Sequence, residues 1–174
     1  MRLPIVLTAL VLSGCASADL GIAYGPASVA AFTARAEEQP FEVALGRVET
    51  SLRSATQMQC RMMLIDVFPS EIIASRLEHA LRESGTYNHR ASVEIRADLL
   101  SAELVSIGES YVALEVHVSS TVSDGYSVRA VRPYENAVLA VRACENAERA
   151  IYLAADDIVR AIAEHPRFSE LHSG

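Results

Sequence analysis

The spacing of large apolar residues along the chain separates predicted strands from predicted helices. Apolar side chains alternate with other residues in 41–45, which is the period of a half-buried strand. The alternation is strict in 93–99 and again in 112–118, and Asp124-Gly125 predicts a tight turn into a further strand over 126–130. We therefore expect one strand followed by an antiparallel meander of three strands with a polar outer face.

Two segments carry apolar residues at the spacing of an amphipathic helix. The first covers 69–84, where Pro69 suits the first turn and Gly85 suits the position after the last turn. The second runs from about 145 to 164 and is ended by Pro166. Its apolar stripe consists of Ala147, Ile151, Ala154, Ala155, Ile158, Ala161 and Ile162.

One apolar sheet face and two apolar helical stripes predict an α+β fold. The expected architecture is a two-layer sandwich, in which an antiparallel meander plus one βα unit carries both helices on one face of the sheet. The single periplasmic domain is expected over residues 41–170. Within it, 51–59 is predicted to be a loop, and the apolar run 62–65 fits either a strand or a buried approach to the first helix.

The N-terminus has the pattern of a secretory signal. Arg2 precedes an apolar run and then small residues that end at a cysteine. Leu12-Ser13-Gly14-Cys15 resembles the bacterial lipobox, which implies a signal peptide over 1–14 and acyl chains on Cys15. The next residue is Ala16 rather than Asp, which in the sorting rule of that motif implies the outer membrane. The alternative is an ordinary signal peptide with Cys15 incidental.

Residues 15–40 differ in composition from the predicted domain. They are rich in alanine and contain the conformational breakers Gly21, Gly25, Pro26 and Pro40. We predict that they form a flexible tether after the lipidated Cys15, with at most one frayed helix over 28–38.

Charge and composition exclude several classes of function. The chain has 174 residues with 15 basic and 22 acidic side chains, and every basic residue is arginine. Loss of 1–14 would remove Arg2 alone among the charged residues, so the mature balance is 14 − 22 = −8. This balance does not suit nucleic-acid binding, and the absence of lysine excludes chemistry that needs a lysine amine.

Residues that often form active sites are dispersed along the chain. The five histidines are predicted to be solvated surface groups: His79, His89, His117, His165 and His172. Asp156-Asp157 and the nearby Glu145 and Glu148 are expected to solubilise the outer face of the last helix, with Arg149 and Arg160 one turn away as partners. We expect no catalytic residues, no metal site and no cofactor.

Cys60 and Cys144 are predicted to form a disulfide. A lipid signal places the mature chain in the oxidising periplasm, where two remaining thiols pair by default. A right-handed crossover between the first two strands would make the two helices parallel, so both cysteines would lie at one end of the sandwich. The alternative is two separate buried thiols.

The order of these segments resembles a group of small envelope lipoproteins of proteobacteria. The carrying features are the lipobox, a helix that closes on Leu-Arg-Glu-Ser-Gly-Thr-Tyr at 81–87, the meander and the terminal amphipathic helix. The group includes the LPS-assembly lipoprotein LptE, YajG-type lipoproteins and the auxiliary lipoproteins of lipid-transport ABC systems. The resemblance implies a lipid-anchored protein on the periplasmic face of the outer membrane.

Three functions are compatible with this sequence. The first is a non-enzymatic accessory or scaffold subunit of an envelope assembly or lipid-transport system, which binds a protein partner through the polar sheet face or a strand edge. The second is a lipid or glycolipid carrier with a cavity between helices and sheet. The third is a periplasmic hydrolase. In all three the anchor is the contact with the membrane.

Overall fold

The computed structural model describes residues 25–50 and 58–173. The signal segment and Cys15 lie outside the described residues. The elements are α1 (Pro26–Glu38), β1 (Ala44–Thr50), β2 (Met58–Cys60), β3 (Met63–Ile65), α2 (Pro69–Glu83), β4 (Glu94–Val105), β5 (Tyr111–Ser120), β6 (Tyr126–Pro133), α3 (Ala140–Glu164) and the short 3-10 helix η1 (Phe168–Leu171).

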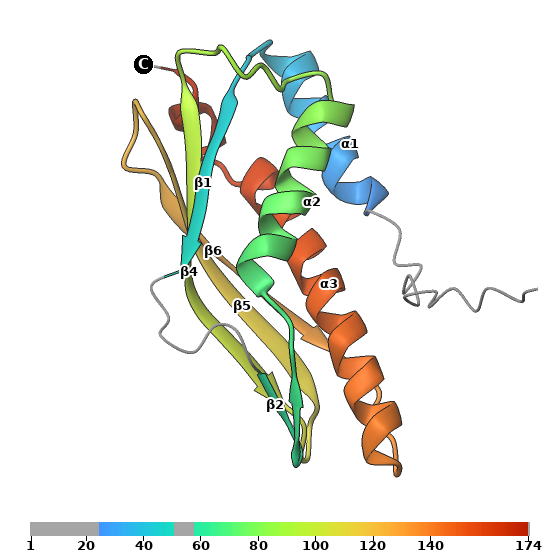
Figure 1. Cartoon of the computed structure of the whole chain (residues 1–174). Helices are drawn as coiled ribbons and strands as arrows, with labels where there is room; N and C mark the ends of the chain where they lie inside the picture. Colours follow the sequence, from blue (N-terminus) through green and yellow to red (C-terminus); the bar gives the residue numbers. More distant parts are fainter. Residues whose placement is uncertain (1–24, 51–57, 174) are drawn as a thin grey trace, which may run out of the picture.

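A mixed four-stranded sheet in the order β1-β4-β5-β6 forms one layer of the molecule (Figure 1). β1 pairs with β4 in parallel, whereas β4–β5 and β5–β6 are antiparallel. The chain passes from β1 to β4 through α2, as expected of a βα unit. The predicted α+β class is therefore confirmed, with its βα unit and its meander.

A small second sheet joins β2 and β3 in an antiparallel hairpin. The loop predicted over 51–59 therefore ends earlier than expected, because β2 begins at Met58. The run 62–65 contains the partner strand, β3. This run is not a buried segment, because Ile65 is buried while Met62 and Leu64 are exposed.

The helices α1, α2 and α3 lie on the same side of the sheet, and the other side of the sheet is uncovered (Figure 1). The helices predicted over 69–84 and 145–164 are present as α2 and α3, and α3 begins earlier than expected, at Ala140. In Figure 1 α3 begins at the lower end of the molecule and α2 begins near its middle, and both helices run upward, so they are parallel.

The helix allowed within the predicted tether is present as α1, but the expectation that it is frayed and flexible is wrong, because α1 packs on the domain. Phe32 is fully buried and meets Phe168 edge-on, with ring centroids 5.5 Å apart. The Arg35 guanidinium donates a hydrogen bond of 2.8 Å from Nε to the carbonyl of Ala163 in α3. Because most other residues of α1 are small, its apolar stripe is weak in the sequence although the helix packs closely.

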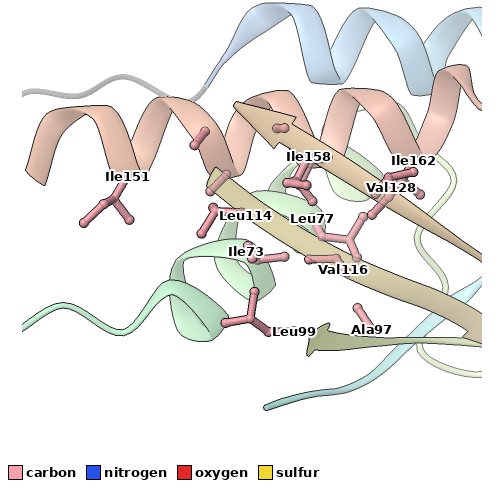
Figure 2. Close-up of a cluster of buried hydrophobic side chains, with 14 of the residues drawn as sticks. Ile73, Leu77, Ala97, Leu99, Leu114, Val116, Val128, Ile151, Ile158 and Ile162 are labelled. Atoms are coloured by element: carbon pink, nitrogen blue, oxygen red, sulfur yellow. The ribbon is translucent and has the colours of Figure 1, made fainter. Parts of the chain in front are cut away.

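The space between helices and sheet is filled by aliphatic side chains. Figure 2 shows Ile73 and Leu77 of α2 directed toward the strands, where Leu99 and Leu114 meet them. α3 contributes larger residues such as Ile158 and several fully buried alanines, namely Ala147, Ala154, Ala155 and Ala163. The alanines allow the axis of α3 to lie close to the sheet.

We expect Leu77→Ala and Ile158→Ala each to lower the free energy of unfolding by about 2 to 5 kcal/mol. Both side chains are fully buried, so truncation removes apolar contacts and leaves a cavity. The exposed Arg149→Ala serves as a control on α3, with an expected change within about 0.5 kcal/mol. Chemical denaturation of the three variants measures this, and equal stability of all three would contradict the assigned core.

Candidate functional site

A disulfide joins Cys60, the last residue of β2, to Cys144 in the first turns of α3. The two Cα atoms lie 5.7 Å apart although the residues are 84 positions apart in the chain. The two cysteines can pair because α2 and α3 are parallel. Cys60 lies in the segment that leads into α2 and Cys144 lies near the start of α3, so both are at the same end of the molecule. The bond fixes the β2–β3 hairpin to the N-terminal end of α3.

Arg61 reinforces this connection from the turn of the hairpin. Its φ of 55° lies in the left-handed region, which is uncommon for a residue with a side chain. The backbone N–H donates to Ser106 Oγ in the β4–β5 turn at 3.0 Å. The guanidinium donates to Asn136 Oδ1 at 2.6 Å and to two carbonyls of the loop before α3, those of Ala137 and Val138.

Three segments distant in the sequence are thus held together at one end of the molecule. Figure 1 shows the two hairpin turns and the start of α3 at its lower end. We call residues 60–64, 106–109 and 136–144 the clamped end. The bridge and the hydrogen bonds of Arg61 and Asn136 connect all three parts of it.

The uncovered side of the sheet carries charged and polar side chains. A shallow hollow lies on it beside the edge strand β1; its lining residues, here called the open-face hollow, are Arg47, Glu49, Glu94, Arg96, Asp98 and Ser119. Arg47 pairs with Glu49 at 2.9 Å, and Arg96 pairs with Glu94 at 2.8 Å. The polar outer face predicted from the alternation of the strands is therefore present.

Gly46 allows the side chain of Glu94 to lie across β1. A Cβ atom at this position would come within 2.5 Å of the Oε1 atom of Glu94. Parallel pairing also places Glu49 beside Asp98 on the neighbouring strand. The hollow consequently presents carboxylates and guanidinium groups next to an unpaired strand edge, which is a surface for polar contacts.

The histidines are more engaged than expected. His117 contacts Ser127 Oγ at 3.2 Å and the carbonyl of Asp124 at 2.8 Å. His165 stacks on Tyr126, and His172 stacks on Phe41 with burial that lowers its pKa. His117 lies on the polar face of β5, as expected, with hydrogen-bonding partners there. The expectation of solvated surface groups is wrong for His165 and His172, which are partly buried against aromatic rings.

Asp156 does not lie on the outer face of α3, so this expectation is wrong as well. It is buried together with Arg76 of α2, whose Nε lies 3.6 Å from Asp156 Oδ1. The backbone N–H of Gly25 donates to the same oxygen at 3.2 Å, so the carboxylate also holds the start of α1. Burial raises the pKa of Asp156, and the charge of Arg76 opposes this shift.

The other predicted pairs of α3 are rearranged. Asp157 pairs with Arg132 at 3.2 Å and with Arg160 at 3.3 Å, so Arg160 contacts the residue after the predicted one. Glu145 pairs with Arg142, which precedes it in the helix. The carboxylates therefore serve separate contacts and do not form a shared site.

We expect Asp156→Ala to lower the free energy of unfolding by about 2 to 3 kcal/mol, because it leaves the buried guanidinium of Arg76 without its carboxylate and the partly buried N–H of Gly25 without its acceptor. The raised pKa means that folding favours the neutral form of this carboxyl group over its ionised form, compared with the unfolded chain. Asp156→Asn, which keeps an oxygen for Gly25, should therefore cost less. Asp157→Ala is the matched control, since its pairs are partly exposed and worth about 1 kcal/mol or less. Equal denaturation midpoints for Asp156→Ala and Asp157→Ala would contradict this assignment.

Within residues 25–50 and 58–173, no group of three or more histidine, cysteine, aspartate or glutamate residues is arranged to hold a metal ion. None of the helices in these ranges has the length and apolarity of a membrane span.

Comparisons with known proteins give distant similarities of structure. No family model matches the chain, and no curated protein matches it. The chain is similar to protein XCC0632 of family DUF330 from Xanthomonas campestris, with a TM-score of 0.48 and 12% identity over 71% of this chain and 84% of the other. A candidate lipoprotein from Caulobacter crescentus gives a TM-score of 0.41 and 10% identity over 79% and 91% of the two chains. A minor lipoprotein from Acinetobacter baumannii gives 0.36 and 15% over 70% and 91%. These comparisons do not assign the chain to a family.

Proposed function

We propose that this protein is a non-enzymatic lipoprotein that holds a partner protein in an envelope assembly or a lipid-transport system. Acyl chains on Cys15 would anchor it to the periplasmic face of the outer membrane. The motif Leu12-Ser13-Gly14-Cys15 and the following Ala16 support the anchor and its location. An oxidising compartment agrees with the bridge between Cys60 and Cys144.

The observation that carries the proposal is the open-face hollow beside β1. Strand β1 is at the edge of the sheet and offers backbone groups to an added strand. Arg47 and Glu49, which belong to β1, have side chains that are 81% and 53% exposed. Their mixed charge suits a polar segment of a partner protein rather than an apolar ligand.

The packing of the helices favours this proposal over a lipid carrier. A carrier needs a large apolar cavity between helices and sheet. Here Leu77, Leu114 and Ile158 fill that layer without exposure to solvent. The buried alanines of α3 bring helix and sheet together where a lipid would have to enter.

A photo-crosslinking amino acid in place of Arg47 or Arg96 tests the proposal in cells that produce the native protein. We expect both positions to give the same discrete crosslinked species with one other envelope protein. Glu83, exposed at the end of α2, provides the control position. Crosslinks of equal yield at Glu83, or none at the two sheet positions, would contradict a partner on this face. Lipid that copurifies in stoichiometric amount would favour the carrier instead.

A further inference from the structure

The clamped end exposes an unusual concentration of aliphatic side chains. Among the described residues, six large apolar side chains are more than half exposed: Met62, Leu64, Ile107, Val138, Leu139 and Val141. All six belong to the clamped end, and Met62 and Val138 are 98% and 97% exposed. Exposed apolar residues of a single protein are ordinarily scattered, so this clustering indicates a contact surface.

The clamped end is held in place by strong connections. The Cys60–Cys144 bridge fixes the hairpin of Met62 and Leu64 to the first turns of α3. The hydrogen bonds of Arg61 attach the same hairpin to the β4–β5 turn of Ile107 and to the carbonyl of Val138. The aliphatic side chains are therefore presented together by a rigid support, which lowers the entropic cost of a contact.

The chemistry of this surface suits the hydrocarbon boundary of a membrane. Its exposed side chains are methionine, leucine, isoleucine and valine, without the aromatic residues that dominate the energetics of protein interfaces. They project from two turns and a helix start rather than line a groove. Arg142 is paired with Glu145 at 3.4 Å, and Arg61 is engaged with oxygen atoms of the domain itself. No excess of basic charge is thus available to select anionic head groups.

The length of chain before α1 allows the clamped end to reach the membrane that would hold Cys15. Gly25 lies beside Asp156, and Asp156 is 156 − 140 = 16 residues after the start of α3. Along the helix this corresponds to about 24 Å. Cys15 precedes Gly25 by 25 − 15 = 10 residues, which span at most about 33 to 36 Å.

We propose that the clamped end inserts its aliphatic side chains into the surface of the phospholipid bilayer that anchors the chain, with zwitterionic lipid as the binding partner. This inference rests on the proposed lipid anchor. Two attachments to one membrane, the acyl chains and the clamped end, fix the orientation of the domain. The helices then extend away from the membrane, and the uncovered side of the sheet, opposite the helices in Figure 1, faces along the membrane. The open-face hollow lies on that side, where it would meet a neighbouring protein.

Site-specific fluorescence of the full acylated protein in phosphatidylcholine vesicles tests this insertion. Ile107→Cys and Val138→Cys each add a thiol that an environment-sensitive dye can label, since Cys60 and Cys144 are bridged. Ser169→Cys, exposed in η1 away from the clamped end, is the matched control. Each labelled variant is used only if its denaturation midpoint matches that of the parent chain.

We expect the dyes at 107 and 138 to shift to shorter emission wavelengths on vesicles and to lose most of their fluorescence when the lipid is brominated. The dye at 169 should change in neither respect. Addition of phosphatidylglycerol should not increase the quenching. A vesicle-bound protein whose dyes at 107 and 138 remain in water would overturn the proposal. A wavelength shift without quenching by brominated lipid would assign this end to a second copy of the chain and would overturn it too.

Flotation of the same samples separates the two proposals. A chain that floats through its acyl groups but shows no quenching contradicts the inserted end and leaves the anchor intact. A protein that its native cells deliver without acyl groups contradicts the anchor, whether or not it floats. If the dyes of that protein are quenched on brominated vesicles, the inserted end stands without the anchor; if they are not quenched, the inserted end is contradicted as well.

Discussion

Cys60→Ser is expected to lower the free energy of unfolding by about 4 to 5 kcal/mol, on the chain-entropy account of a bridge that closes so large a loop. The bridge spans 84 positions in the sequence, so the unfolded chain gains much freedom when it is removed. The loss is a large fraction of the stability of a typical domain, about 5 to 15 kcal/mol. Denaturant titration of the variant and the parent chain measures the difference.

Two controls separate the bridge from the side chain that carries it. Reduction of the parent chain with dithiothreitol should reproduce the effect of Cys60→Ser, and the reductant should not change the stability of the variant. Thiol labelling of the unreduced, denatured parent should modify neither Cys60 nor Cys144. Complete labelling of both would show that the native protein lacks the bridge. The clamped end would then have no covalent connection between the β2–β3 hairpin and α3.

Cys15→Ser is expected to abolish acylation and to release the chain from membranes, or to leave an uncleaved precursor. The physical reason is that each buried methylene group of an acyl chain contributes about 0.8 kcal/mol to membrane binding. The six aliphatic side chains of the clamped end present a much smaller apolar area. Fractionation of cells that produce the variant, together with incorporation of labelled palmitate, measures both effects.

Ala16→Asp is the matched control for this experiment. It keeps Cys15 and its acyl chains but changes the residue that the lipobox resemblance connects with release to the outer membrane. We expect this variant to take up palmitate and to remain in the inner membrane. Palmitate uptake by Cys15→Ser together with unchanged outer-membrane fractionation would contradict a lipid anchor on Cys15.

The meander and the helices α2 and α3 could be predicted because each has one buried face and a regular period. In β4, Ile95, Ala97 and Leu99 are fully buried while Arg96 between them is exposed. In contrast, α1 has Phe32 as its one fully buried large side chain among many alanines. An alanine-rich segment has the same composition in a tether as in a closely packed helix, so only tertiary contacts distinguish the two.

The charged residues show a second limit of sequence periodicity. Arg76 lies off the strongest apolar stripe of α2 and Asp156 lies among alanines of α3, yet both are buried against each other. The contact forms because α2 and α3 are parallel neighbours and α1 covers them. A helical pattern considered alone identifies which residues are charged, but the partner helix decides which of these are covered.

The parts of the candidate site also differ in how far the sequence predicts them. The bridge followed from the compartment and from the handedness of the crossover, and the polar sheet face followed from alternation. The clamped end was missed because the apolar run 62–65 has the composition of a buried strand. Its other members, Ile107 and Val138, are single apolar residues in polar turns. The role of Arg61 could not be predicted from the sequence, because its hydrogen-bond partners lie in loops that are distant in the sequence.

The central claim is that the mature chain begins at Cys15 and carries lipid there. The direct test is the mass of the intact protein extracted from the membranes of its native cells, with the N-terminal peptide sequenced after digestion. We predict a chain that starts at Cys15 and carries a diacylglycerol on the thiol and a further acyl chain on the amine. A chain that starts at another residue, or an unmodified Cys15, would contradict the claim.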